Sequence, residues 1–169
     1  NPETTESLKL LKGRISSLSG LYAILMQNGN IESVQLDTYI EEIANSIAES
    51  YLSDSENIFI SVHCDHVYIS TKTAAPFGLI INEIVTNAIK YAFPDNRPGT
   101  IDISLSFHDK AIHLEIRDDG EGLPECFDVT VSGGMGFQLV GMLCSQLGGT
   151  YSIGREFKNT VFRLDVPAD

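Results

Sequence analysis

Three polar residues within one apolar stretch could do chemistry together. Glu83, Asn87 and Lys90 stand at i, i+4 and i+7 in the segment Gly78–Tyr91, so in a helix they share one face. The apolar residues of that segment form a stripe wide enough to bury most of the helix. An amide oxygen can bind a hard cation such as Mg²⁺, and an ammonium group can offset phosphate charge. The alignment suggests a site, although a solvated amphipathic face has the same pattern.

Two glycine-flanked segments downstream complement this helix. Asp118 precedes Gly120 and Gly122, where the backbone can bend sharply and approach a ligand. A buried carboxylate at such a turn can accept a hydrogen bond from an exocyclic amine. The segment 133–136, Gly-Gly-Met-Gly, leads into an expected helix whose free amides suit phosphate. One glycine cluster alone is typical of a structural turn, but the three clusters together predict a site for a base and a metal-bound triphosphate.

The elements that must position these residues follow from hydrophobic periodicity. The expected fold is α+β. It is a two-layer α/β sandwich in which helices cover one face of a mixed, mostly antiparallel sheet, and a helical segment precedes it. Asp37 is the expected N-cap of the second helix. We expect residues 1–53 to form the helical segment and residues 54–169 the site-bearing domain. Helices are expected over 3–27, 38–52, 78–91 and 137–147, and residues 73–76 open the third of them. Strands are expected over 58–62, 67–69, 101–107, 112–116, 151–153 and 160–166; those at 101–107 and 112–116 form a hairpin that turns at 108–110, and 124–132 is a loop.

The first helix carries a heptad pattern. Leu8, Leu11, Ile15, Leu18, Tyr22 and Leu25 alternate spacings of three and four residues, a 3.5-residue period typical of coiled coils and helix bundles. A homodimer through the N-terminal helices is the expected partner arrangement. The alternative is a helix that packs only on its own domain.

Composition narrows the function classes. A net charge of −12 over 169 residues argues against a nucleic-acid partner, which would require clustered Lys and Arg. Three scattered cysteines argue against a disulfide framework and favour a cytoplasmic setting. No apolar run could span a bilayer, so we expect no membrane contact by this segment, while segments outside it could anchor a longer protein. His63-Cys64-Asp65-His66 has metal-ligating residue types, but a turn between two strands is the favoured reading.

The motifs together resemble the ATP-binding domain of histidine kinases, within the ATPase superfamily that also includes gyrase, Hsp90 and MutL. The segment 82–91 is similar to the family's N box, Asp118-x-Gly120-x-Gly122 to its G1 box, and the segment 134–139 to its G2 box. The resemblance covers about residues 55 to 166. The residues flanking the N box resemble sensor kinases whose dimerisation helices are of the second histidine-kinase-A type, and residues 18 to 39 fit the second helix of that region and its link onward.

The resemblance implies a role for each motif residue. Asp118 would bind the adenine amino group, Asn87 would coordinate Mg²⁺, Lys90 would contact phosphate, and Glu83 would polarise the attacking group. The implied catalytic residues are Glu83, Asn87 and Lys90, and the implied ATP-binding residues are Asn87, Lys90, Tyr91, Asp118, Gly120, Gly122, Gly134, Met135, Gly136, Phe137 and Thr160. The implied activity is transfer of the γ-phosphoryl group of ATP to a histidine, and onward to a response regulator receiver domain.

Two departures from the family pattern keep alternatives open. The third glycine box, usually Gly-Thr, is Asn159-Thr160 here, and none of the four histidines lies in a helical context. We therefore expect the phosphoacceptor histidine to lie upstream of this sequence. The alternatives are an ATPase or serine kinase of the anti-sigma type in the same superfamily, with Glu83 activating water or a hydroxyl group, and a non-catalytic dimer module with a degenerate ATP fold.

Overall fold

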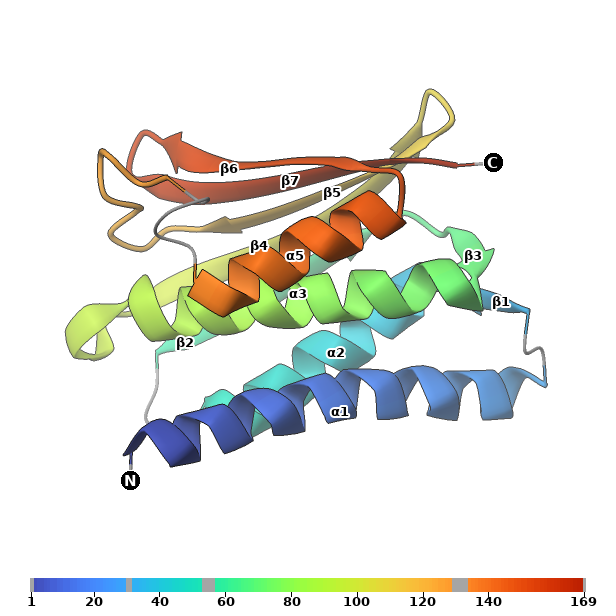
Figure 1. Cartoon of the computed structure of the whole chain (residues 1–169), viewed down its shortest axis with the longest axis horizontal. Coiled ribbons are helices and arrows are strands. Elements are labelled where there is room, and N and C mark those ends of the chain that lie inside the picture. Colours follow the sequence, from blue (N-terminus) through green and yellow to red (C-terminus); the bar gives the residue numbers. More distant parts are fainter. Residues whose placement is uncertain (1, 30–31, 53–56, 129–133, 169) are drawn as a thin grey trace.

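The computed structural model describes residues 2–29, 32–52, 57–128 and 134–168. Its helices lie on one side of a five-stranded sheet, and α1 is the helix farthest from that sheet (Figure 1). The α+β class and the two-layer arrangement expected from the sequence are confirmed. The helices are α1 (Pro2–Asn28), α2 (Leu36–Tyr51), α3 (Thr71–Tyr91) and α5 (Gly134–Gln146), with a 3₁₀ turn η1 (Pro94–Asn96).

The sheet is mixed, with one parallel and three antiparallel pairings. Its order is β2-β4-β5-β7-β6, and only β2 and β4 run parallel, on either side of the crossover through α3. The strands are β2 (Ile58–Cys64), β4 (Gly99–His108), β5 (Ala111–Asp118), β6 (Thr150–Glu156) and β7 (Asn159–Pro167). The predicted hairpin turns at Asp109 and Lys110, both in the left-handed region at φ 52° and 58°, as a two-residue type I′ turn requires.

A second, two-stranded sheet joins the helical segment to the start of α3. Its strands are β1 (Ser33–Gln35) and β3 (Tyr68–Ser70), which pair antiparallel. The sequence predicts an extended connection and a short strand here but not their pairing. Ser70 caps α3, because its hydroxyl accepts a hydrogen bond from the Thr73 amide at 3.2 Å. The helix therefore begins two residues before the expected opening at Thr73.

The predicted N-cap of α2 is wrong. Gln35 occupies the cap position, in extended conformation and without a side-chain cap, and the Leu36 amide donates instead to the Val67 carbonyl at 2.8 Å. Asp37 lies one residue inside the helix and is buried. Its carboxylate accepts from Gln35 Nε2 at 3.0 Å and lies 2.6 Å from His66 Nδ1. A tertiary partner therefore replaced the local capping bond that the residue type suggests.

One continuous hydrophobic core runs from the helical segment to the sheet. It includes Leu21 of α1, Tyr39 of α2 and Phe77 of α3, together with the inward faces of β4, β5 and β7. The space between α1 and α3 is narrow, because a Cβ on Gly13 would lie 2.9 Å from Asn82 Oδ1. No helix within the described residues is both long and apolar enough to cross a membrane.

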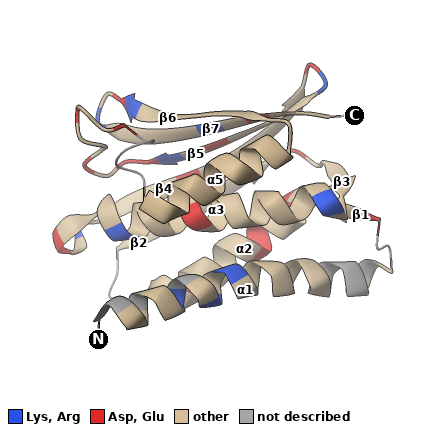
Figure 2. Cartoon of the chain, in the orientation of Figure 1, with Lys and Arg blue, Asp and Glu red and all other residues tan. Residues whose placement is uncertain are grey.

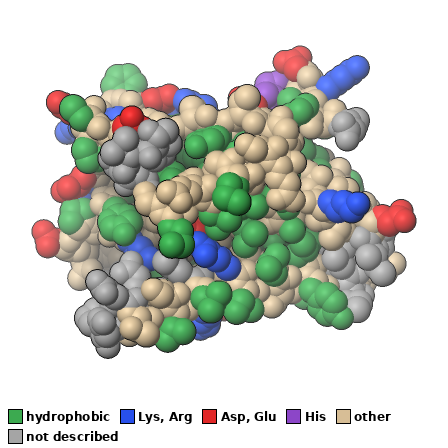
Figure 3. Space-filling view, viewed as in Figure 1, with side chains coloured by type: hydrophobic (Ala, Val, Ile, Leu, Met, Phe, Trp, Pro, Cys, Tyr) green, Lys and Arg blue, Asp and Glu red, His purple; other side chains and the backbone are tan. Residues whose placement is uncertain are grey.

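The heptad face of α1 points away from this core. Apolar side chains gather along α1 on the surface of the molecule (Figure 3), and five seam residues are 45% to 62% exposed: Leu8, Leu11, Ile15, Leu18 and Tyr22. The side chain of the sixth, Leu25, lies outside the described residues. The helix thus packs on its own domain through one face and leaves its 3.5-residue seam exposed.

Candidate functional site

A cavity of about 1060 Å³ opens where α1, α3, α5 and the ends of β5 and β7 meet. Its volume lies at the upper end of the range of small-molecule sites. The residues that line it come from segments as far apart as Ser7 and Phe162. Ile116, Ile153 and Phe162 of the sheet provide an apolar floor on which a flat ring could lie.

Asp118 occupies the sheet end of the cavity. It is the last residue of β5, is only 6% exposed, and pairs in register with Thr160 of β7. One carboxylate oxygen accepts a hydrogen bond from the Gly120 amide at 3.1 Å. Burial raises the pKa of this carboxyl above its ordinary value, while hydrogen bonds from Gly120 and Thr160 partly oppose the rise. A buried acceptor of this kind suits an amino group on a ligand.

The turn after Asp118 requires its glycines. A Cβ on Gly120 would lie 2.4 Å from the Ala92 carbonyl oxygen, which also accepts from the Glu121 amide at 3.0 Å. Gly122 has φ +77°, and its Cβ would lie 2.7 Å from the Lys158 carbonyl oxygen. The turn is therefore fastened to the C-terminal end of α3, which places Asp118 beside that end.

The predicted polar face of α3 lines the cavity. Glu83, Asn87 and Lys90 all contribute to its wall, so the solvated-face alternative does not hold. Glu83 is 1% exposed, and its Oε1 accepts a hydrogen bond from Arg14 Nε of α1 at 2.6 Å. That bond raises the pKa of the Arg14 guanidinium. A buried carboxylate is thus compensated by a cation from the helical segment.

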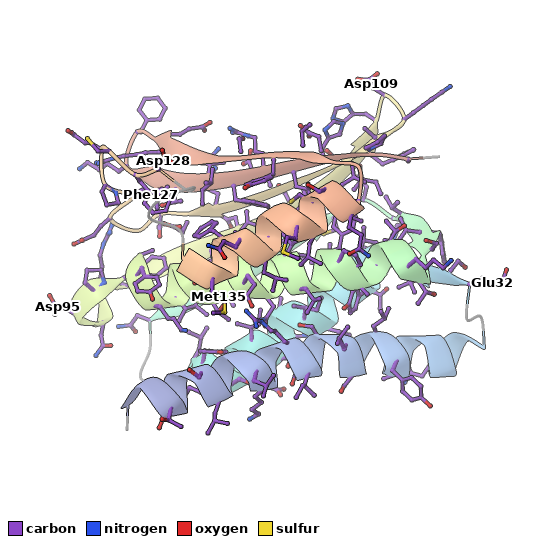
Figure 4. All side chains as sticks on the ribbon, in the orientation of Figure 1. Glu32, Asp95, Asp109, Phe127, Asp128 and Met135 are labelled. Carbon is purple, nitrogen blue, oxygen red and sulfur yellow. The ribbon has the colours of Figure 1, made fainter. Side chains whose placement is uncertain are left out.

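The glycine segment ends the cavity at the start of α5. Gly134 adopts φ +60°, and the helix begins there rather than at the expected Phe137. A Cβ on Gly136 would lie 2.9 Å from Glu83 Oε2 and 3.9 Å from Asn87 Nδ2, so a side chain here would press on the Glu83 carboxylate. Figure 4 shows Met135 at this end of α5, on the same side of the molecule as Phe127 of the loop after β5. The N-terminal amides of α5 therefore lie next to Glu83 and Asn87.

The structure brings the predicted site residues together. Asp118 and Asn87 line one cavity, along with nine of the other ten predicted residues. Those nine are Glu83, Lys90, Tyr91, Gly122, Gly134, Met135, Gly136, Phe137 and Thr160. Gly120 alone does not line it and acts through its backbone bond to Asp118. Residues 129–132 of the expected loop 124–132 lie outside the described residues.

Sequence reasoning missed the contribution of α1. Ser7, Leu11 and Arg14 line the cavity although they precede Glu83 of α3 by about seventy residues of chain. Phe127 was also missed: its ring meets that of Phe137 edge-on, with centroids 6.0 Å apart. No local spacing relates Arg14 to Glu83, so the sequence holds no signal that would pair them.

The histidines lie outside this cavity. His66 contacts Asp37, and His113 Nδ1 lies 2.6 Å from Asp165 Oδ1. Among the described residues, no group of three or more His, Cys, Asp or Glu side chains is placed to hold a metal ion. Burial raises the pKa of the Cys64 thiol to about 12, which is unfavourable for a metal thiolate.

Comparison with known sequences finds relatives that match most of the chain. Residues 72–169 match the family of histidine kinase-, DNA gyrase B-, and HSP90-like ATPases, and residues 1–51 match a family described as histidine kinase. Blue-light-activated histidine kinase 2 of Erythrobacter litoralis is 28% identical over 162 residues, which cover 93% of this chain and 46% of that protein. Sensor histidine kinase PdtaS of Mycobacterium tuberculosis is 30% identical over 146 residues, covering 86% of this chain and 29% of that protein.

The chain thus spans less than half the length of these relatives. Anti-sigma F factor of Geobacillus stearothermophilus is 37% identical, but over 46 residues that cover 27% of this chain and 32% of that protein. Among solved structures, the histidine kinase domain of the Erythrobacter litoralis blue-light-activated histidine kinase superposes with a TM-score of 0.84 at 28% identity, covering 94% of this chain and 74% of that one. With a family match over more than half its residues, the chain belongs to the histidine kinase-, DNA gyrase B-, and HSP90-like ATPases.

Proposed function

We propose that the cavity binds ATP with Mg²⁺ and that the chain is the catalytic part of a sensor histidine kinase. It would transfer the γ-phosphoryl group to a histidine outside this sequence, for onward transfer to a response regulator receiver domain. The observation that carries the proposal is the shared cavity of Asp118 and Asn87. An acceptor suited to a purine amine and an amide suited to a hard cation face the same enclosed space.

The residues present fit a magnesium-bound nucleoside triphosphate. Asp118 would hold the base over the apolar floor, and the amides at Gly134 and Gly136 would receive the phosphates at the start of α5. Asn87 would supply an oxygen ligand to Mg²⁺, and Lys90 would offset phosphate charge. Tyr91, Gly122, Met135, Phe137 and Thr160 would complete the walls. When bound, the ion neutralises charge on the phosphates, which a chain with net charge −12 would otherwise repel.

The remaining assignments follow from the same proposal. Residues 1–53 would belong to the dimerisation and phosphotransfer region, and residues 54–169 would form the ATP-binding domain. The exposed seam of α1 would pair with helices of a second copy, and Glu83 would polarise the attacking group. The anti-sigma alternative is not favoured, because the relatives that match most of the chain are sensor histidine kinases.

Calorimetry tests the proposal directly. A non-hydrolysable ATP analogue should bind the unmodified chain, and more tightly with Mg²⁺ than without it. Asn87→Ala should remove most of the Mg²⁺ enhancement, about tenfold in affinity, because a ligand to the ion is lost. Asn45→Ala is the matched control, since Asn45 is exposed on α2 outside the cavity. Equal enhancement by Mg²⁺ in the Asn87 variant would contradict the assignment, as would no binding by the unmodified chain.

A further inference from the structure

The helical segment provides part of the nucleotide cavity itself. Ser7, Leu11 and Arg14 of α1 line it, and the close approach at Gly13 holds that part of α1 against α3. Figure 2 shows basic positions along α1 and an acidic position on α3, the helix above it in this view. Any ligand that fills the cavity toward α1 therefore meets this helix.

Arg14 is oriented by a buried carboxylate. Its Nε donates to Glu83 Oε1 at 2.6 Å, and the Glu83 side chain is 2% exposed while that of Arg14 is 29% exposed. Within the described residues this is the only hydrogen bond of the guanidinium. A guanidinium presents five N–H donors, so one edge can engage Glu83 while the other edge remains for a planar or phosphate-like acceptor.

The position of this pair along α3 tells which part of a nucleotide it would meet. The Asp118 turn is fastened to Ala92, Asn87 lies about one turn back from there, and Glu83 lies another turn beyond. From Ala92 to Glu83 the helix rises about 13 Å. The order along α3 is therefore base acceptor, metal-binding amide, then ion pair. A nucleotide that places its base at Asp118 and its metal at Asn87 points its outermost phosphate at Arg14.

The charges lining the cavity strengthen this reading. Among the described residues, its cations are Arg14 and Lys90, and its acids are Glu83, Asp118 and Glu121. Glu83 lies directly beneath Gly136 at the start of α5, where phosphate is expected. Without Arg14, its carboxylate would stand as an uncompensated negative charge beside the phosphates. The guanidinium cancels that charge and adds donors of its own.

We propose that Arg14 is a ligand of the terminal phosphate, supplied by the helical segment and positioned by Glu83. The inference rests on the proposed binding of ATP and concerns which residues contact its third phosphate. It makes the helical segment part of the ATP site, so that a triphosphate strengthens the docking of α1 on α3 and a diphosphate does not. By linkage, docking of α1 strengthens triphosphate binding by the same factor.

The test compares two nucleotides on matched variants of the whole chain. Calorimetry with Mg²⁺ measures the affinities of ADP and of the non-hydrolysable ATP analogue for the unmodified chain, Arg14→Met and Lys12→Met. Lys12→Met removes the same charge from an exposed position of the same helix, outside the cavity. The preference for the triphosphate over ADP should fall about tenfold or more in Arg14→Met, the loss of charge-assisted hydrogen bonds, and stay unchanged in Lys12→Met.

A second variant separates direct contact from neutralisation of Glu83. In Arg14→Met with Glu83→Gln no buried charge is left unpaired, so this pair also guards against misfolding of the single variant. If Arg14 touches the phosphate, the preference stays lost in the double variant. Recovery of the preference would mean that Arg14 only neutralises Glu83, and would overturn the proposal.

Hydrogen exchange gives an independent readout. Amides of α1 from Ser7 to Ser17 should gain protection with the ATP analogue over ADP in the unmodified chain, and this difference should vanish in Arg14→Met. Equal loss of affinity for both nucleotides overturns the proposal. Tighter triphosphate binding by Arg14→Met overturns it as well, because Arg14 would then hinder the terminal phosphate instead of binding it. If the unmodified chain binds neither nucleotide, the proposed function fails first and this inference with it.

Discussion

Replacing Gly78 by alanine tests whether α1, α2 and α3 are packed as one unit. A Cβ at Gly78 would lie 2.0 Å from Tyr39 Oη and 2.6 Å from Tyr39 Cζ. Tyr39 is fully buried, and its hydroxyl donates to the Ser17 carbonyl of α1 at 3.0 Å. The same burial raises the pKa of Tyr39, so the ring stays neutral and keeps its donor. One methyl group on α3 must therefore displace a ring of α2 and its bond to α1.

The cost follows from three contributions. Overpacking a buried site costs about 1–3 kcal/mol. Loss of the Tyr39–Ser17 hydrogen bond costs about 1 kcal/mol. Alanine recovers up to about 1 kcal/mol through its higher helix propensity. The net loss in the free energy of unfolding is about 2 kcal/mol, which for a chain of this length lowers Tm by about 4–8 °C.

Gly20→Ala is the matched control. Gly20 also lies inside a helix, but a Cβ there meets nothing within 4 Å. This variant should gain about 0.5–1 kcal/mol from helix propensity alone. Urea and thermal unfolding followed by circular dichroism measure both changes. The reasoning is refuted if the two alanines shift stability in the same direction, because the only difference invoked between them is the Tyr39 contact.

Three further outcomes are expected. Burial raises the pKa of Asp118, so the stability contributed by its protonated form is full at low pH and is lost as pH rises through the raised pKa. Asp118→Asn should therefore raise Tm more at pH 7 than at pH 4. The same variant should bind the ATP analogue more weakly in calorimetry. Gly148→Ala, at φ +63°, should cost about 1 kcal/mol in urea unfolding, and a smaller loss than half of that would contradict the left-handed strain. Leu18→Glu should leave Tm of the monomer unchanged and abolish dimers in analytical ultracentrifugation, and dimers that persist would exclude the seam of α1 as the interface.

Periodicity and glycine chemistry carried most of what the sequence could predict. The hairpin around Asp109, the strands of the sheet and α3 are local patterns, and each appears where its period places it. The site was predictable for a related reason. The spacing of residues on one helix face, and of glycines at two tight turns, determines their local geometry within a few residues of chain.

Features that depend on distant partners were not predictable. Asp37 has the residue type of an N-cap, but His66 and Gln35 lie near enough to take its carboxylate, and the helix begins earlier. The local sequence pattern alone indicates that Arg14 is a solvated residue off the heptad seam. Its role in the cavity arises only because α1 packs against α3 at Gly13, a contact between segments separated by some seventy residues. Tertiary packing decides such cases, and no single-sequence pattern contains it.

The parallel edge strand β2 bears on how the catalytic unit can be excised. The family match begins at residue 72, yet β2 pairs along its whole length, Ile58–Cys64, with β4. A truncation at residue 72 would strip away that strand and leave a bare row of backbone donors and acceptors on β4, open to self-association. A recombinant fragment that keeps the sheet intact must therefore start before Ile58, although the family match alone would suggest a start at residue 72.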